Sequence, residues 1–133
     1  RSALHTGKEV LGLHATVQGN QCAAAANLLS NQSVPSAMVE TFESSSGHLA
    51  DRLLAALEAG VNAGGEEGPV FSAGVEVAHK VSWPIVDLRV DWDDEPISKL
   101  QTIWNEYQPQ VEAYLTRALN PDDAPSYGVP GDM

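Results

Sequence analysis

Two charged side chains stand two positions apart in a stretch that otherwise carries alternating apolar residues. Asp87 and Arg89 alternate with Val86, Leu88 and Val90, so in a strand both charges lie on one face. A guanidinium in that position could bind a substrate carboxylate through two parallel hydrogen bonds. If the face is buried, the pair forms a charge-compensated polar element of the core, and a structural ion pair is the simpler interpretation.

The histidines and one acidic cluster do not form a recognisable metal site. The four histidines fall in four different expected elements, without an H-x-H or H-E-x-x-H pair: His5, His14, His48 and His79. The acidic cluster lacks the glycine and the distal glutamate of a calcium loop: Asp91, Asp93, Asp94 and Glu95. Acids just before a helix favour the positive end of its dipole, which explains the cluster more simply. We expect no metal ion.

Patterns for covalent catalysis and cofactor binding are also missing from the sequence. The single cysteine, Cys22, opens a run of small residues and is expected to be buried and inert. The sequence has no G-x-S-x-G elbow, no G-x-G-x-x-G and no phosphate loop. From spacing alone we expect an α+β domain without a cofactor and without an identifiable reaction.

Charge and length narrow the classes of partner. The chain has 133 residues, with 7 Lys+Arg against 18 Asp+Glu and a formal net charge of −11. Such a chain repels phosphate backbones and anionic lipids, which argues against nucleic acid and membrane partners. One cysteine cannot form an internal disulfide, so we expect a cytoplasmic location. We assign residues 1–119 to one domain and residues 120–133 to an irregular tail.

The first half of the chain predicts a strand, a turn and two helices. Period-two alternation over residues 11–17 predicts a strand, and Gly19-Asn20 predicts a turn. For the following run, residues 22–26, a buried strand and a helix both remain open. A helix is expected from about Ser33 to residue 44, and a second one from Leu49. The second helix is expected to bury Leu49, Leu53, Leu54, Ala56 and Leu57.

The second half predicts a loop, two strands and a long helix. Residues 64–69 read as a flexible acidic loop, and residues 71–78 and 85–90 as strands. The final helix carries an apolar stripe at spacings of three and four: Ile97, Leu100, Trp104, Tyr107, Val111, Tyr114 and Ala118. Pro109 lies inside the stripe and predicts a kink or break. The stripe either packs on the chain's own sheet, the simpler interpretation, or joins subunits of a homo-oligomer.

Four motifs in the same order resemble those of the DUF1028 family. Residues 48–60 with Ala63-Gly64-Gly65-Glu66 resemble its helix and acidic loop, and residues 85–91 resemble its V-D-L-R-V-D strand. His5-Thr6-Gly7 resembles its H-T-G turn, and Ala25-Ala26-Asn27 stands at its Q-G-N motif. The resemblance extends to about residue 105. The chain departs from the family at Gly12, where an acid is common, and at residues 68–71, where a basic, glutamine-containing stretch is usual.

The resemblance implies an αββα sandwich of the N-terminal-nucleophile (Ntn) hydrolase type. In that class the side chain of the first residue is the nucleophile and its free α-amine is the base; an α-amine of ordinary pKa, about 7.7–8.0, is partly neutral near pH 7. Arg1 cannot act as this nucleophile, and Ser2 could only after removal of Arg1. We therefore expect the opening strands and the nucleophile to come from an N-terminal segment of the same domain, acting as a companion chain. Without it, one apolar face of the sheet would be uncovered.

The same resemblance suggests roles for individual residues. Asn27 would be an oxyanion-hole donor, with a turn-capping amide as the equal alternative. Glu66 would orient the amine of the nucleophile or a cationic group of the substrate, although an ordinary solvated acid is the simpler interpretation. The remaining candidates for substrate contacts are Asp87, Arg89, Ser72 and His5.

We therefore expect an Ntn-type amidohydrolase, or part of one, that cleaves a C–N amide bond in a small metabolite or peptide. The alternative is a non-catalytic binding or assembly module that keeps the scaffold and uses residues 97–118 for oligomerisation. A fold by itself does not decide between them, because function resides in the site.

Overall fold

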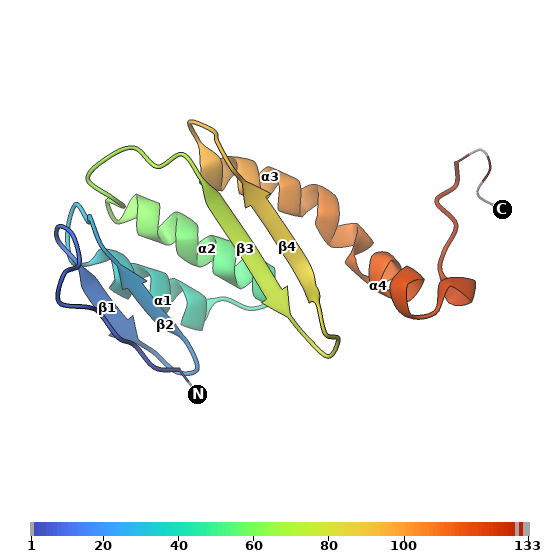
Figure 1. Cartoon of the computed structure of the whole chain (residues 1–133), viewed down its shortest axis with the longest axis horizontal. Helices are drawn as coiled ribbons and strands as arrows, with labels where there is room; N and C mark the ends of the chain where they lie inside the picture. The colour runs from blue at the N-terminus through green and yellow to red at the C-terminus, as the bar shows by residue number, and fades with distance from the viewer. Residues whose placement is uncertain (1, 130, 132–133) are drawn as a thin grey trace.

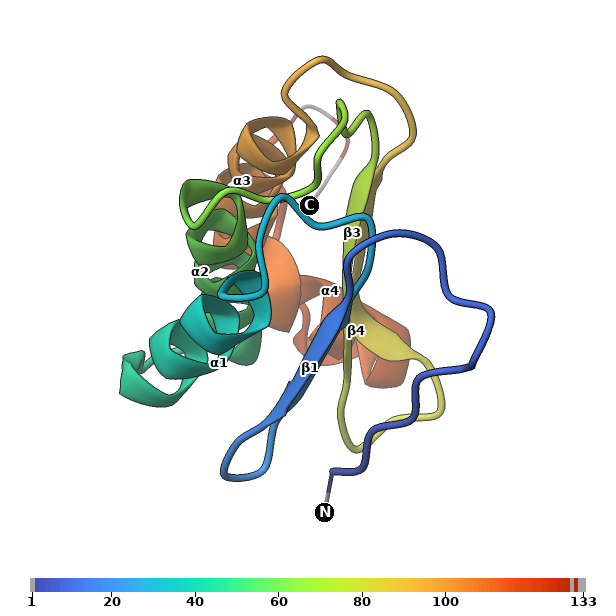
Figure 2. The same cartoon turned by 90° about the vertical axis from the view of Figure 1, so that its left-hand side faces the viewer.

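Two β-hairpins form one layer of the structure, and three helices form the layer beside it (Figures 1 and 2). The computed structural model describes residues 2–129 and 131. The α+β class expected from the sequence is confirmed. Within this part of the chain there is one strand layer and one helical layer, and the four-layered αββα sandwich stays a prediction.

The first hairpin pairs β1 (Ala15–Gln18) with β2 (Ala23–Ala26) in antiparallel register, from Ala15 opposite Ala26 to Gln18 opposite Ala23. The run of small residues is therefore a strand. The expected strand over residues 11–17 is wrong in its first half, because Gly12 takes a left-handed conformation with φ of +68°. Leu11 and Leu13 lie outside β1 and are exposed, although their carbonyls still accept hydrogen bonds from the N–H groups of Leu28 and Leu29.

Helices α1 (Val34–Ser44) and α2 (Leu49–Asn62) pack against each other beneath the hairpins. Arg52 of α2 lies over the ring of Phe42, 4.0 Å from its centroid, and donates to the Phe42 carbonyl at 2.9 Å. Both helices match their expected positions. One expectation for α2 is wrong in part: Leu49 is 41% exposed instead of buried, and Leu53 and Leu57 are only partly buried.

The main core lies between α2, α3 (Pro96–Tyr107) and the second hairpin, β3 (Ala73–Ala78) with β4 (Pro84–Val90). Its buried members alternate along the strands and recur at helical spacing: Ala50, Leu54, Val75, Val77, Val86, Val90, Leu100, Trp104 and Val111. Trp104 is fully buried, and its indole Nε1 donates to Asp51 Oδ1 at 2.6 Å, which joins α3 to α2. The buried indole therefore has a hydrogen-bond acceptor for its only donor.

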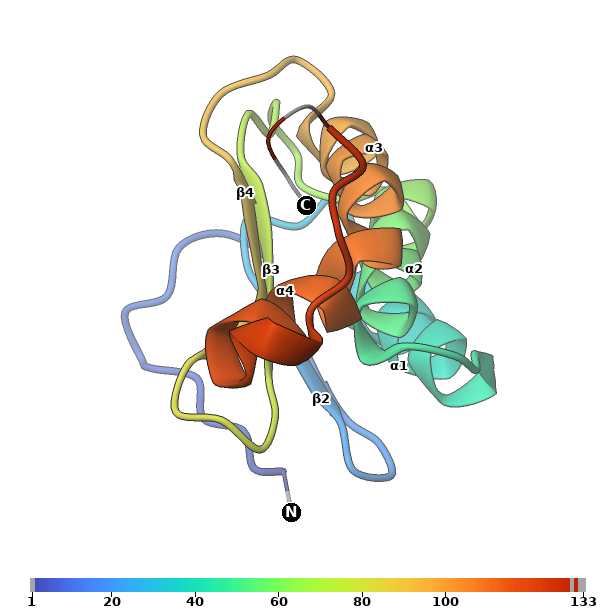
Figure 3. The same cartoon turned by 90° about the vertical axis from the view of Figure 1, so that its right-hand side faces the viewer.

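The long apolar helix is broken where the sequence predicts. After α3 comes a 3₁₀ turn, η1 (Gln108–Gln110), which contains Pro109, and then α4 (Val111–Leu119). Figure 3 shows α4 leaving the helical layer and turning toward the beginning of β4. The Tyr107 hydroxyl donates to the Ile85 carbonyl at 3.2 Å; burial, and then the neighbouring Tyr114, raise the pKa of Tyr107.

Most of the apolar stripe is used inside the chain. Leu100, Trp104 and Val111 are buried, whereas Tyr114 and Ala118 are exposed. Packing on the chain's own strands, the simpler of the two interpretations, therefore accounts for the stripe as far as residue 111. Beyond α4, the tail expected to be irregular contains one 3₁₀ turn, η2 (Pro121–Asp123). Residues 130, 132 and 133 of the tail lie outside the described residues.

The outer face of the second hairpin is polar, and the expected uncovered apolar sheet face is wrong at this hairpin. Glu76 stands opposite Asp87, and Gly74 stands opposite Arg89, with all four residues exposed. The apolar residues of both strands point to the helices instead.

Among the described residues, no helix is long and apolar enough to cross a membrane.

Core packing predicts a large loss of stability for Leu100→Ala. Leu100 is fully buried, so truncation should lower the free energy of unfolding by about 2–5 kcal/mol. Urea unfolding followed by circular dichroism measures the change. The matched control is Leu119→Ala, because Leu119 is 58% exposed and its truncation should change stability by less than about 0.5 kcal/mol. Equal effects of the two substitutions would contradict the described core.

Candidate functional site

The end of β2 is joined to the glycine-rich loop by backbone hydrogen bonds. Leu29 and Glu66 form an antiparallel bridge, Ser30 N donates to the Gly65 carbonyl at 3.0 Å, and Glu67 N donates to the Leu28 carbonyl at 2.8 Å. This loop, expected to be flexible, is therefore held in place. The pairing also brings two of the predicted site residues, Asn27 and Glu66, to the same end of the molecule.

Asn27 already makes a structural contact. Its side chain is half-buried, and Nδ2 donates to the carbonyl of Leu11 at 3.3 Å. This bond supports the turn-capping interpretation. An amide nitrogen carries two hydrogens, so the second one is left for another acceptor, such as a developing oxyanion.

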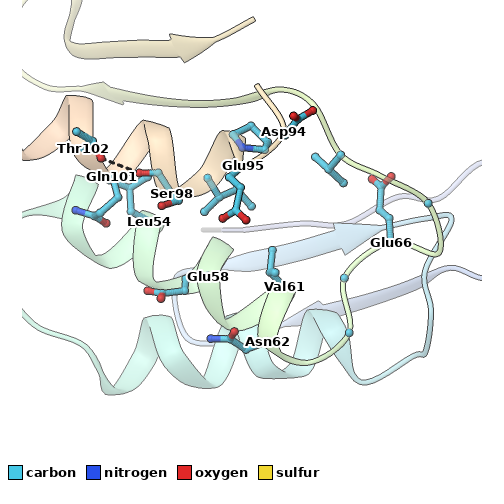
Figure 4. Close-up of a pocket in the computed structure, with 16 residues that line it drawn as sticks. Leu54, Glu58, Val61, Asn62, Glu66, Asp94, Glu95, Ser98, Gln101 and Thr102 are labelled. Atoms are coloured by element: carbon cyan, nitrogen blue, oxygen red, sulfur yellow. Dashed lines mark hydrogen bonds between the residues drawn. The ribbon is translucent and has the colours of Figure 1, made fainter. Parts of the chain in front are cut away.

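Glu66 lies on the wall of a pocket of about 640 Å³ between the second half of α2, residues 64–70 and the start of α3 (Figure 4). Its lining includes four carboxylates from three segments: Glu58, Glu66, Asp94 and Glu95. No Lys, Arg or His is among the described residues that line it. Several carboxylates around one concave surface produce a negative potential, which attracts a cationic group.

Two of the pocket's acids were assigned other roles from the sequence, and one was overlooked. Asp94 and Glu95 were interpreted as acids that precede a helix, and they do stand just before α3; Asp93 Oδ1 accepts from Glu95 N at 2.8 Å in that turn. Glu58 is exposed on α2, and the sequence motifs give it no role. The sequence between Glu58 and Glu66 contains a helix end and a pair of glycines. This is the only sequence signal that could have linked the two acids.

Asn27 and the remaining predicted site residues do not line this pocket. Asp87 and Arg89 share one face of β4, as predicted, but that face points outward, so the inward-facing polar core pair is wrong. Arg89 Nε lies 3.8 Å from Asp91 Oδ1 instead, and both side chains are largely exposed. An exposed pair of this kind contributes little to stability.

Ser72 and His5 are exposed, and neither lines the pocket around Glu66. Ser72 directly precedes β3, and His5 belongs to the segment before β1. Among residues 2–129 and 131, no group of three or more His, Cys, Asp or Glu side chains is placed to hold a metal ion. The carboxylates around the pocket are thus spread along its walls rather than gathered on one point.

Comparison with known proteins identifies relatives for most of the chain. Residues 1–100 match DUF1028, a family of unknown function. Among solved structures, protein SPO2555 from Silicibacter pomeroyi, also assigned to DUF1028, is 34% identical, with a TM-score of 0.69. The match covers 78% of this chain and 44% of that one, so the chain spans less than half the length of this relative. No curated protein matches the sequence.

The conformation of Gly64 leads to a prediction about the stability of the loop over residues 64–69. Its φ is +124°, and a Cβ placed there would overlap Ser30 Oγ and Asn31 Nδ2. Asn31 Nδ2 also donates to the Ala63 carbonyl at 2.7 Å at the end of α2. Gly64→Ala should therefore cost about 1–3 kcal/mol and speed hydrogen exchange at the amides of Ser30 and Glu67.

The control for Gly64→Ala is Gly68→Ala, since a Cβ at Gly68 meets no atom within 4 Å and its φ is not in the left-handed region. Thermal unfolding and amide exchange are compared for the two variants. A loop that is equally well protected in both would show that the pairing of residues 28–30 with 65–67 does not depend on the glycine.

Proposed function

Because the chain belongs to the DUF1028 family, we propose that it contributes part of the active site of an Ntn-type amidohydrolase. The observation that carries the proposal is the pairing of residues 28–30 with 65–67, which brings Asn27, itself outside the pocket lining, to the same end of the molecule as Glu66 on the wall of the acidic pocket. Amide donors and carboxylates are two of the components that acyl transfer requires.

The nucleophile is supplied by a companion segment of the same domain. The hydroxyl or thiol of its first residue attacks the amide carbonyl carbon and transfers its proton to the free α-amine of that residue. The C–N bond then breaks, and the leaving amine takes that proton. Water hydrolyses the resulting acyl-enzyme, which releases the acid and regenerates the nucleophile.

Asn27 and Glu66 have separate roles in this scheme. The free amide hydrogen of Asn27 stabilises the oxyanion that forms when the carbonyl is attacked. Glu66 binds the α-amine of the nucleophile or a positively charged group of the substrate, since an exposed carboxylate on the pocket wall attracts either one. The four carboxylates favour a small amide that carries a cationic group over an anionic one.

The alternative function, an assembly module that oligomerises through residues 97–118, has less support. The stripe it would use is already buried against the chain's own core at Leu100, Trp104 and Val111. Only the α4 end of the stripe, with Tyr114 and Ala118, is exposed for a subunit interface.

Asn27→Ala tests the catalytic role. In the complete domain, chain plus companion segment, loss of the oxyanion donor should lower kcat about 10²–10³-fold, with a smaller change in KM. Turnover is measured as release of p-nitroaniline from a panel of acyl p-nitroanilides with cationic, neutral and anionic acyl groups. We expect the cationic members to react best.

Asn105→Ala is the matched control, because Asn105 is exposed on α3 and its side chain accepts a hydrogen bond from Gln101 of the same helix. Circular dichroism establishes that both variants are folded. Full activity of the folded Asn27→Ala variant would remove Asn27 from the site. A companion segment that begins with a residue other than Thr, Ser or Cys, or that has a blocked amine, would overturn the Ntn mechanism itself.

A further inference from the structure

A groove separates the two hairpins over the helical layer. It has a volume of about 500 Å³ and is bounded by β2 on one side, β3 on the other, and α1 and α2 beneath. Neither β1 nor β4 reaches it. The strands of both hairpins slant the same way in Figure 1, so the groove runs along two strand edges that face each other.

The edge of β2 that faces the groove has no partner strand among the described residues. Gly19 N donates to the Cys22 carbonyl at 3.0 Å, which directs the backbone groups of Cys22 toward β1. Because these groups alternate in direction along an antiparallel strand, those of Ala23 and Ala25 point away from β1. Likewise, β3 pairs only with β4 in this part of the chain, and its other edge is unpaired.

The side chains at the bottom of the groove are apolar and incompletely covered. Leu49, Leu53 and Leu57 lie at helical spacing along α2, and Met38 and Phe42 belong to α1. Helical periodicity predicts that the three leucines are buried, yet Leu49 is 41% exposed. Within the part of the chain that the structure describes, Glu76 is the only charged residue that lines the groove. The side chains that line the groove are thus typical of a protein core, but no further layer of the described residues covers them.

We propose that this groove binds one extended β-strand, supplied by the companion segment of the same domain. The strand adds to the edges of β2 and β3 at once and joins the two hairpins into one continuous sheet. The inference rests on the companion segment of the proposed function, but not on its chemistry. The length of the relative supports this occupant, since more than half of the SPO2555 chain lies outside the match.

Two unpaired edges select a strand over other occupants. An extended backbone can hydrogen-bond to both edges, whereas a small apolar ligand can only cover the leucines. The edge of β2 also lacks the devices that discourage strand addition, because Ala23–Ala26 contain no charge and no proline. A second copy is a poor occupant, because two chains with a net charge of −11 repel each other.

The geometry also describes the strand that fits. The groove-lining part of β2 is Ala23, Ala24 and Ala25, three residues, which is roughly 10 Å at about 3.3 Å per residue. Alternate side chains of the incoming strand point down onto Leu53, Leu57 and Phe42, so they should be apolar. The intervening ones lie beside exposed Ala23, Ala25 and Gly74 on the outer face.

The single cysteine provides a direct readout of occupancy, since Cys22 lines the groove and is half-buried. The chain is prepared alone and co-expressed with the remainder of its gene product. We expect co-expression to slow alkylation of Cys22 by N-ethylmaleimide at least tenfold. It should also slow amide exchange at Ala23 and Ala25, with little change at Ala24, which already faces β1.

Leu53→Glu places a charge at the bottom of the groove and should abolish both effects. Its matched control is Leu119→Glu, because Leu119 is exposed on α4, far from the groove in the chain, and should leave both effects unchanged. Circular dichroism checks the fold of each variant. If Leu53→Glu does not fold, amide exchange of the unsubstituted protein at Ala23 and Ala25 decides the question alone.

Three results would overturn the proposal: unchanged exchange at Ala23 and Ala25 on co-expression, protection of the chain alone with a doubled mass by ultracentrifugation, or a gene product without further residues. The second result would assign the groove to another copy. Failure of the proposed amide hydrolysis gives a different outcome. A protected groove without amide hydrolysis contradicts the enzymatic function but supports the binding of a strand in the groove. Hydrolysis with an unprotected groove contradicts only the strand.

Discussion

Helix α2 is the element on which the remainder of the structure depends, because it packs in two directions. Ala50 and Leu54 on one side bury against α3 and the second hairpin, and Asp51 accepts the indole hydrogen bond of Trp104. On the other side, Arg52 binds Phe42 and holds α1 in place. The two hairpins do not pair with each other, so their relative position is set through this helix.

This arrangement explains why the site and the groove lie at opposite faces of one helix. The last turns of α2 carry Glu58 into the acidic pocket and lead directly into the loop that holds Glu66. Its leucines at positions 49, 53 and 57 face the groove between the hairpins. A strand bound in the groove would therefore lie against the same helix that shapes the acidic pocket. Completion of the sheet and formation of the pocket would then both depend on α2.

The sequence predicted the order of the secondary structure well, because the signals involved are local. The strand over residues 85–90 and the break at Pro109 depend on side-chain alternation and on one missing N–H, and both were found. Periodicity also identified the apolar face of α2. It could not tell which part of that face is covered, since coverage depends on elements distant in the chain. Leu49, for example, lies on the predicted apolar face of α2 and is nevertheless 41% exposed.

The candidate site was less predictable for the same reason. Asn27 and Glu66 are 39 positions apart, and only backbone pairing between residues 28–30 and 65–67 places them at one end of the molecule. The alternation of β4 correctly placed Asp87 and Arg89 together. It left open whether their face pointed toward the helices or away from them, and the packing of Val86 and Val90 decided this.

The composition of β2 has a consequence for fidelity of assembly. A strand made only of alanine offers an incoming segment its main-chain groups and almost no side-chain pattern, so the edge itself scarcely distinguishes one sequence from another. If a companion segment binds in this groove, as proposed, discrimination would come from the shape of the leucine-lined floor and from a high local concentration of that segment. Chains released without that segment would present a generic template, and the cell would have to clear them or keep them dilute.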